Sequence, residues 1–221
     1  MKFVAPLLAA GMLGLACLGA QAQSVEVAGV QYASVAEVGN NKLVLNGTGV
    51  RYKAVFQVYT AGLYLARKAH TPEEAMSSPG PKRIAVSMLR PIDATELGKL
   101  FIRGVEDNTS KEDMYRLMPG LVRMGQIFSE QKMLATGDTF VVDWVPGTGT
   151  IITVKGKQQG DAFKEPEFFN ALMRIWLGHH PADWKLKDAL LDRGDDMAPL
   201  RPNAPVGVAA AASPQGGIRR Q

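Results

Sequence analysis

The order of the predicted elements indicates an α+β fold built on an antiparallel sheet. Strand-like alternation of apolar and polar residues fills the first part of the chain, helical periodicity follows, and a strand hairpin precedes two last helices. Because strands and helices are grouped and do not alternate one by one, a parallel βαβ sheet is not expected. No segment repeats with a period of about 20 to 50 residues, which argues against a solenoid or a propeller.

Residues 1–22 have the pattern of a secretory signal peptide. Lys2 precedes an apolar run from Phe3 to Leu18, and the small-residue triplet Ala20-Gln21-Ala22 follows it as at a cleavage site. A transmembrane anchor is the competing interpretation, but the run is short for a span of about 20 residues and no basic stop-transfer cluster follows. We therefore expect a periplasmic or secreted protein with no integral membrane segment after cleavage.

The only cysteine, Cys17, lies within this predicted signal peptide. A lipidated start is an alternative, although Gly14 occupies the position where a lipoprotein signal usually has leucine. After cleavage the chain would carry no thiol, which excludes disulfides, cysteine-ligated metals and thiol nucleophiles. The formal net charge of +4 is spread without a basic block, so nucleic acid is not an expected partner.

A single domain is predicted over residues 23–194, which is long enough to enclose a full hydrophobic core. Residues 195–221 are predicted to be a disordered tail, because their Ala, Pro and Gly content leaves too little bulky apolar surface to offset the entropy of the chain. Within the domain, the first strands are expected at Val25 to Val27 and Lys42 to Leu45, with one or two more before and after Thr60-Ala61-Gly62.

The middle of the chain is predicted to change from strand to helix. Arg83 to Leu89 has the composition of a strand and stops before Pro91. Asp93 and Glu96 then resemble a capping box, which begins a helix that includes Val105. The remaining predicted elements are a helical region from Lys111 to Gln131 that is broken or restarted at Pro119-Gly120, a hairpin of Thr139 to Val145 with Thr150 to Val154, and helices at Glu167 to Leu177 and Ala182 to Leu191.

Arg51 stands out among the strand-forming residues Val50 to Tyr59. Burying its guanidinium among apolar neighbours is costly unless the charge meets an anion. If this run is mostly extended, side chains of equal parity share a face, which places Arg51 and Tyr59 on the same side. The alternative is a strand face open to solvent, on which the stem of Arg51 packs while its charged end reaches water.

Five short motifs occur in order along the chain: Asn46-Gly47-Thr48-Gly49-Val50-Arg51, Val58-Tyr59-Thr60-Ala61-Gly62-Leu63-Tyr64-Leu65, Pro81-Lys82-Arg83-Ile84-Ala85-Val86, Pro146-Gly147-Thr148-Gly149-Thr150 and Ile175-Trp176-Leu177-Gly178. Together they resemble the bacterial chalcone isomerase-like family over roughly Ser24 to Leu191. The resemblance implies an open-faced β-sandwich, in which an antiparallel sheet has a layer of helices packed on one face, with a ligand cleft between the two layers.

The resemblance gives Arg51 and Tyr59 specific roles. In plant chalcone isomerases, the arginine at the position of Arg51 polarises the ketone of a chalcone. Three residues before the glycine of their G-[VL]-Y-L strand, those enzymes have a threonine that orients a water, whereas this chain has Tyr59. The related plastid fatty-acid-binding proteins instead pair the arginine with a tyrosine and grip a fatty-acid carboxylate. The enzymes' Tyr-x6-Asn pattern is incomplete here, since no tyrosine lies between Ile92 and Ser110, so Asn108 is assigned no role.

We therefore expect an exported, non-catalytic binder of a fatty acid or a similar amphipathic carboxylate, with Arg51 and Tyr59 as the ligand-binding residues. The first alternative is an isomerase or intramolecular lyase acting on a chalcone-like enone or another polyketide-like ligand, in which Arg51 would be catalytic. The second is an envelope accessory domain that has lost any ligand. No cofactor is expected, and the histidines His70, His179 and His180 give little support for a metal site.

Two further groups of apolar residues carry expectations. The tryptophans Trp144, Trp176 and Trp184 are interpreted as anchors of the hydrophobic core. Six methionines are candidates for lining a pliable ligand cleft, although their helical spacing also favours ordinary core packing. They are Met88, Met114, Met118, Met124, Met133 and Met173.

Overall fold

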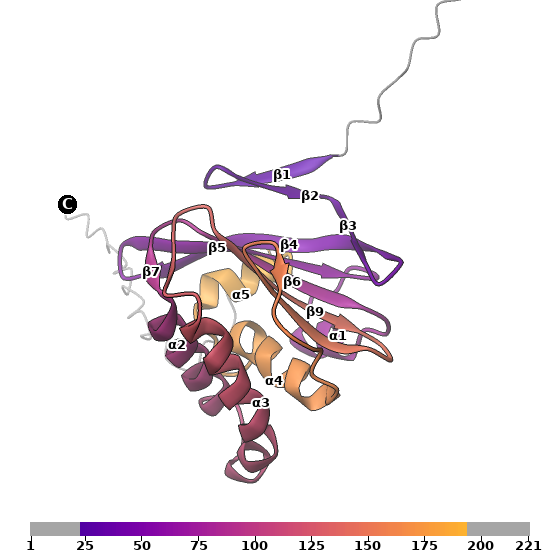
Figure 1. Ribbon diagram of the computed structural model, residues 1–221. Helices are drawn as coiled ribbons and strands as arrows, with labels where there is room; N and C mark the ends of the chain where they lie inside the picture. Colours follow the sequence, from indigo (N-terminus) through magenta and orange to yellow (C-terminus); the bar gives the residue numbers. More distant parts are fainter. Residues whose placement is uncertain (1–22, 194–221) are drawn as a thin grey trace, which may run out of the picture.

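The computed structural model describes residues 23–193 of the 221-residue chain (Figure 1). The predicted signal peptide, residues 1–22, and the predicted disordered tail, residues 195–221, lie outside the described residues, as does Gly194. Within the described part, no helix combines the length and the apolar character needed to cross a membrane.

The described residues contain the predicted elements in the predicted order, together with one short helix and five short strands that the sequence analysis did not predict. The strands are β1 (Ser24–Val27), β2 (Val30–Ala33), β3 (Val35–Val38), β4 (Asn41–Lys53), β5 (Phe56–Leu65), β6 (Lys82–Met88), β7 (Ile92–Asp93), β8 (Met133–Leu134), β9 (Thr139–Val145), β10 (Gly149–Val154) and β11 (Lys157–Gln158). The helices are α1 (Pro72–Ser77), α2 (Ala94–Glu106), α3 (Lys111–Ser129), α4 (Pro166–Leu177) and α5 (Trp184–Leu190).

Seven of the strands form one antiparallel sheet, in the order β11-β10-β9-β6-β5-β4-β3, and the helices pack on one of its faces (Figure 1). The predicted arrangement of an antiparallel sheet with a helical layer is therefore confirmed. The strands β1 and β2 pair only with each other, as do β7 and β8.

The main hydrophobic core lies between the sheet and the helices, and aromatic rings form its centre. Phe101 of α2 lies edge-on to Phe140 of β9, with 5.1 Å between ring centroids, and 5.8 Å from Trp176 of α4. Phe128 of α3 packs against the same two phenylalanines, with ring centroids 5.3 Å from Phe101 and 5.8 Å from Phe140. This cluster holds three helices against the middle of the sheet, because each element contributes a large apolar surface to it.

The predicted break at Pro119-Gly120 is wrong, because α3 continues through both residues. Proline removes one backbone donor from a helix and leaves the carbonyl four residues earlier, that of Tyr115, without its usual partner. Both Pro119 and Tyr115 are exposed, so water can satisfy that carbonyl. Gly120 faces the core, where a Cβ atom would lie 2.7 Å from the ring of Phe168, so the glycine allows α3 to approach α4 closely.

The hairpin of β1 and β2 covers part of the sheet face opposite the helices (Figure 1). Tyr32 of β2 is buried against Gly62 of β5, where a Cβ atom would lie 2.6 Å from the tyrosine ring. Its hydroxyl donates a hydrogen bond to Thr60 Oγ1 at 2.8 Å. Burial raises the pKa of Tyr32 to about 12. The glycine of the Gly62-Leu63-Tyr64-Leu65 motif therefore makes room for the ring of Tyr32.

The run from Val50 to Tyr59 is not one extended strand, contrary to the premise used for the sequence prediction. The chain reverses at Ala54 and Val55, where Ala54 has a φ of 54°, and β5 begins at Phe56. Thr60-Ala61-Gly62, expected to separate two strands, lies inside β5. An alanine in the left-handed region is uncommon, and no glycine, proline or asparagine marks this turn, so the sequence did not indicate it.

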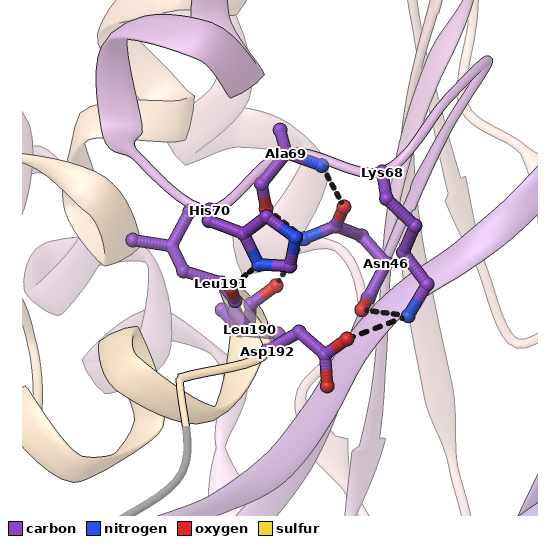
Figure 2. Close-up of polar contacts among 7 residues, drawn as sticks. All are labelled: Asn46, Lys68, Ala69, His70, Leu190, Leu191 and Asp192. Atoms are coloured by element: carbon purple, nitrogen blue, oxygen red, sulfur yellow. Dashed lines mark hydrogen bonds and ion pairs between the residues drawn. The ribbon is translucent and has the colours of Figure 1, made fainter. Parts of the chain in front are cut away.

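Asn46 is an extra residue in β4, and its buried side chain joins three segments (Figure 2). The register passes from Leu45 to Gly47 with a shift, which identifies a bulge at Asn46. Its Nδ2 donates to the carbonyls of Ala69 at 2.9 Å and Leu190 at 2.7 Å, while Oδ1 accepts from the Ala69 amide at 2.7 Å. One amide group thus connects β4, the segment after β5 and the end of α5.

The two glycines that follow Asn46 allow α5 to lie directly on β4. A Cβ atom at Gly47 would collide with the Ala189 carbonyl oxygen, and one at Gly49 would lie 2.6 Å from the Ala189 Cβ. Lys68 reinforces the attachment, because its Nζ donates to the Asn46 carbonyl at 2.7 Å and pairs with Asp192 at 3.0 Å (Figure 2). The Asn46-Gly47-Thr48-Gly49 motif therefore has a packing role of its own.

Candidate ligand-binding site

A cavity of about 240 Å³ lies where β4 and β5 meet α2, α4 and the segment before α5. Its walls are largely apolar and are formed by Val58, Ile92, Leu97, Leu100, Phe101 and Ile175. Polar side chains lie among them, and the two predicted site residues, Arg51 and Tyr59, are included. An apolar hollow with a few convergent polar groups has the general form of a small-molecule site.

Arg51 and Tyr59 lie directly opposite each other in the antiparallel register of β4 and β5. Directly opposed residues of an antiparallel pair point to the same face, so the two side chains meet by cross-strand pairing. The Arg51 Cζ lies 5.6 Å from the centroid of the Tyr59 ring. The next pair is Tyr52 with Gln57, so Val58 is an extra residue, and this bulge lets consecutive residues Val58 and Tyr59 both line the cavity.

The hydroxyl of Tyr59 accepts a hydrogen bond from Trp176 Nε1 at 3.0 Å. An indole nitrogen can only donate, so this contact uses a lone pair of the phenol oxygen and leaves the phenol proton for another acceptor. Among the described residues, none accepts a hydrogen bond from this hydroxyl. Trp176 was interpreted from sequence as a core anchor only, and its contact with a residue so distant in the chain carries no sequence signal.

The Tyr59 hydroxyl is kept neutral by its surroundings. Burial raises the pKa of Tyr59 to about 12, and the Asp183 carboxylate acts in the same direction. The Arg51 charge and the Trp176 hydrogen bond act to lower this pKa, but they do not outweigh burial. The phenol therefore remains protonated at physiological pH and is able to donate a hydrogen bond.

The Arg51 guanidinium is partly buried and makes no hydrogen bond or ion pair with any side chain in residues 23–193. One acid near Arg51 is Asp183, the residue that caps α5. Its oxygens accept from the backbone amides of Tyr52 at 2.9 Å, Lys185 at 2.8 Å and Leu186 at 3.1 Å. The Asp183 carboxylate thus accepts hydrogen bonds from backbone amides, and the Arg51 guanidinium at the wall of the cavity has no ion-pair partner in the part of the chain that the structure describes.

Three exposed polar residues that the sequence prediction missed, Arg103, Asp107 and His180, also line the cavity. His180 is positioned through its backbone by Asn108, whose Oδ1 accepts from the His180 amide at 2.8 Å. The Asn108 Nδ2 donates to the carbonyls of His180 at 2.8 Å and Gly104 at 2.9 Å. Asn108, which was assigned no role, therefore fixes the segment after α4 against α2.

One other prediction can be compared with the cavity. The proposal that methionines line it is wrong, because Met88, Met124 and Met173 are buried in the main core and Met118 and Met133 are exposed elsewhere. The remaining one, Met114, packs against that core from its edge. Within residues 23–193, no three His, Cys, Asp or Glu side chains are grouped as a metal site would require.

Comparisons with known proteins place this geometry in context. A family model described as "Chalcone isomerase-like" matches residues 24–192. Among solved structures, the fatty-acid binding protein AtFAP1 of Arabidopsis thaliana is similar, with a TM-score of 0.63 and 16% sequence identity over 77% of this chain and 96% of that chain. At this identity the likeness shows a shared fold. No curated protein matched the sequence.

Proposed function

Because the chain belongs to the chalcone isomerase-like family, we propose that it is a non-catalytic binder of a fatty acid or a similar amphipathic carboxylate. The observation that carries this proposal is the Arg51 guanidinium, which has no anionic partner among the described residues and lies beside a buried, neutral phenol in an apolar cavity. The name of the similar Arabidopsis protein, a fatty-acid binding protein, supports the same class of ligand.

The chemistry of the two side chains suits a carboxylate. A guanidinium presents a planar fork of donors that matches the two oxygens of a carboxylate, and the Tyr59 proton supplies one more hydrogen bond. A charge-assisted hydrogen bond contributes about 1.5–3 kcal/mol. The apolar walls would bury an acyl chain at about 0.8 kcal/mol per CH₂ group, so head group and tail are both recognised.

The size of the cavity limits the ligand. Its volume of about 240 Å³ lies just below the range of about 300–1,000 Å³ found for drug-sized ligands. We therefore propose that the cavity encloses the head group and the first part of the chain. Leu100, which is 38% exposed, and Ile92 would contact the part of a longer chain that leaves through the mouth.

Calorimetry with decanoate and decanol tests this proposal, because the two ligands share a tail and differ in charge. Replacing Arg51 by glutamine removes the charge and leaves a shorter, neutral side chain that can still donate a hydrogen bond. We expect Arg51→Gln to weaken decanoate binding by about 10- to 100-fold and to leave decanol binding nearly unchanged. The matched control is Arg116→Gln on α3, an exposed arginine whose side chain pairs with Glu112 and is not among the residues that line the cavity.

Two outcomes of this experiment would contradict the proposal. Equal decanoate affinity for wild type and a folded Arg51→Gln variant would remove the assigned role of Arg51. A loss that follows Arg103→Gln instead would place the carboxylate at the exposed edge of the cavity and not beside Tyr59.

We also propose that the protein is exported and works in the periplasm or outside the cell. The support for this is the signal-like pattern of residues 1–22. Mass spectrometry of protein isolated from separated cell fractions checks it, since the processed chain should begin at Gln23 and be found outside the cytoplasm. An unprocessed chain in the cytoplasmic fraction would contradict it.

A further inference from the structure

The end of the hairpin formed by β4 and β5 exposes apolar side chains to solvent. Val55 is 82% exposed, Phe56 is 56% exposed and Tyr52 is 40% exposed. We refer to Tyr52, Lys53, Ala54, Val55 and Phe56 as the hairpin tip. Several large apolar side chains are exposed together at this turn, and they would be removed from water only if a partner covered them. Such a group marks a candidate docking surface.

The hairpin tip also has a basic character. The Arg90 guanidinium lies over the Phe56 ring, with its Cζ 4.7 Å from the ring centroid, and both Lys53 and Arg90 are exposed. Neither Gly49 to Gln57 nor Leu89 to Ile92 contains an acidic residue. The Asp183 carboxylate contacts the hairpin tip at the Tyr52 amide, and its oxygens accept from that amide and from the first amides of α5. The combination of exposed apolar side chains with cations beside them is complementary to an anionic lipid surface, where acyl chains lie beneath negative head groups.

The hairpin tip lies at the edge of the ligand cavity. The Leu89 amide donates to the Val58 carbonyl at 3.0 Å, so the segment that carries Arg90 runs along the base of the hairpin. Val58 and Ile92, from these two segments, both line the cavity. Figure 1 shows the same neighbourhood, with the end of β4 and β5 beside β7 and the start of α2.

We propose that the hairpin tip docks on the surface of an anionic phospholipid membrane, and that the amphipathic ligand passes between bilayer and cavity there. The second half of this statement rests on the proposed function. Val55 and Phe56 would enter the interfacial region, Tyr52 would lie at the level of the head groups, and Lys53 and Arg90 would contact the lipid phosphates. An acyl acid partitions into bilayers, so a cavity that opens at the membrane meets its ligand where that ligand is concentrated.

A second exposed apolar group provides a matched control. Tyr115, Met118 and Val122 lie along one side of α3, at a helical spacing that places them together. The charges beside them are of both signs, since Glu112 pairs with Arg116. This stripe therefore has comparable apolar character without the basic surroundings of the hairpin tip.

Co-sedimentation with vesicles tests the docking surface, using the chain as purified from cells and vesicles of phosphatidylcholine with or without phosphatidylglycerol. We expect wild type to bind the anionic vesicles and to be released by salt. The double variant Val55→Ser/Phe56→Ser should lose about tenfold in partition coefficient, and Lys53→Gln/Arg90→Gln should lose a similar factor on anionic vesicles only. The control Met118→Ser/Val122→Ser should bind as wild type does.

The outcomes separate this inference from the proposed function. Vesicle binding by the hairpin-tip variants equal to that of wild type would overturn the docking surface, even if decanoate still binds in solution. Binding that depends on the hairpin tip, in a protein that takes up no decanoate, would support the docking surface and remove the proposed ligand. We expect Val55→Ser/Phe56→Ser to keep its calorimetric affinity for decanoate, because neither side chain lines the cavity.

Discussion

The indole Nε1 of Trp176 and the hydroxyl of Tyr59 form a 3.0 Å hydrogen bond that joins α4 to β5 at the wall of the cavity. Both residues are buried, with exposed fractions of 1% and 3%. Because the indole takes a lone pair of the phenol oxygen, it fixes the oxygen and directs the phenol proton away from itself. Under the proposed function, Trp176 is thus a positioning residue, which would act on a ligand through Tyr59.

A double-mutant cycle measures this contact. Tyr59→Phe leaves the Trp176 N–H buried without its partner, so we expect the free energy of unfolding to fall by about 1–3 kcal/mol. Trp176→Phe should cost more, because it also removes buried volume. The double variant should be more stable than the sum of the two losses predicts, since no unpaired donor remains. Additive losses in urea unfolding would contradict a direct contact.

The binding of decanoate should depend on the same pair. Tyr59→Phe removes one donor to the carboxylate, and we expect its affinity measured by calorimetry to fall by about 3- to 10-fold. Trp176→Phe retains Tyr59, so its effect should be smaller than that of Tyr59→Phe. A larger effect of Trp176→Phe in a fully folded protein would mean that the indole itself contacts the ligand.

Alkaline pH should destabilise the protein in a defined window. The pKa of Tyr59 and that of Tyr32 are each raised from 10.0 to about 12 by burial. Below pH 10 both states of the protein keep these protons, so the two residues add no pH dependence. Between about pH 10 and 12 the unfolded chain releases these protons while the folded chain retains them, so the free energy of unfolding falls as pH rises, by roughly 2–3 kcal/mol per tyrosine.

Urea unfolding between pH 8 and 12 measures how steeply the free energy of unfolding falls with pH. Tyr59→Phe and Tyr32→Phe should each make this fall less steep. A slope unchanged in both variants would assign the loss to other groups.

Removing the Asn46 side chain should destabilise the fold. Asn46→Ala eliminates the hydrogen bonds to Ala69 and Leu190 and leaves buried backbone groups unpaired, so we expect a loss of about 2–4 kcal/mol in urea unfolding. The control is Asn41→Ala, an exposed asparagine of the same strand, for which a loss below about 1 kcal/mol is expected. Equal effects of the two substitutions would contradict the role given to the buried amide.

Catalysis on a chalcone-like enone is the alternative that a turnover assay decides. Arg51 could polarise a ketone, but Tyr59 occupies the place of the threonine that the sequence resemblance associates with the plant enzymes. We expect no cyclisation of a chalcone above the spontaneous rate at several pH values. Acceleration that disappears in Arg51→Gln would instead establish an enzyme.

The main helices and the central hairpin could be predicted from the sequence because their signals are local. The helix α2 begins at the expected cap, where the Asp93 side chain accepts from the Glu96 amide at 2.9 Å, and β9 and β10 turn at the expected Pro146-Gly147. The strands β7, β8 and β11 have only two residues each, so their pairing depends on tertiary contacts and leaves no periodic pattern in the sequence.

The candidate site could be predicted only in part. Arg51 was found because a cation in an apolar run is unusual, and its proximity to Tyr59 was inferred by strand alternation although the structure achieves it by a turn at Ala54. The contact of Trp176 with Tyr59 was not predicted, because the two residues are 117 positions apart in the sequence. The place of His180 at the cavity was not predicted either, because it depends on the hydrogen bonds of its backbone with Asn108. Such contacts are set by packing, which no short motif encodes.

The attachment of α5 to β4 has a consequence for biosynthesis. Two hydrogen bonds join β4, the strand that carries Arg51, to the region of α5. The Asp183 carboxylate accepts from the Tyr52 amide, and the Leu190 carbonyl accepts from the Asn46 side chain. Both acceptors belong to the last stretch of the described chain to leave a ribosome or a translocation pore. A growing polypeptide that stops before Asp183 lacks both of these contacts to the strand of Arg51. Under the proposed function, the carboxylate site would therefore be complete only when synthesis of the domain is almost finished.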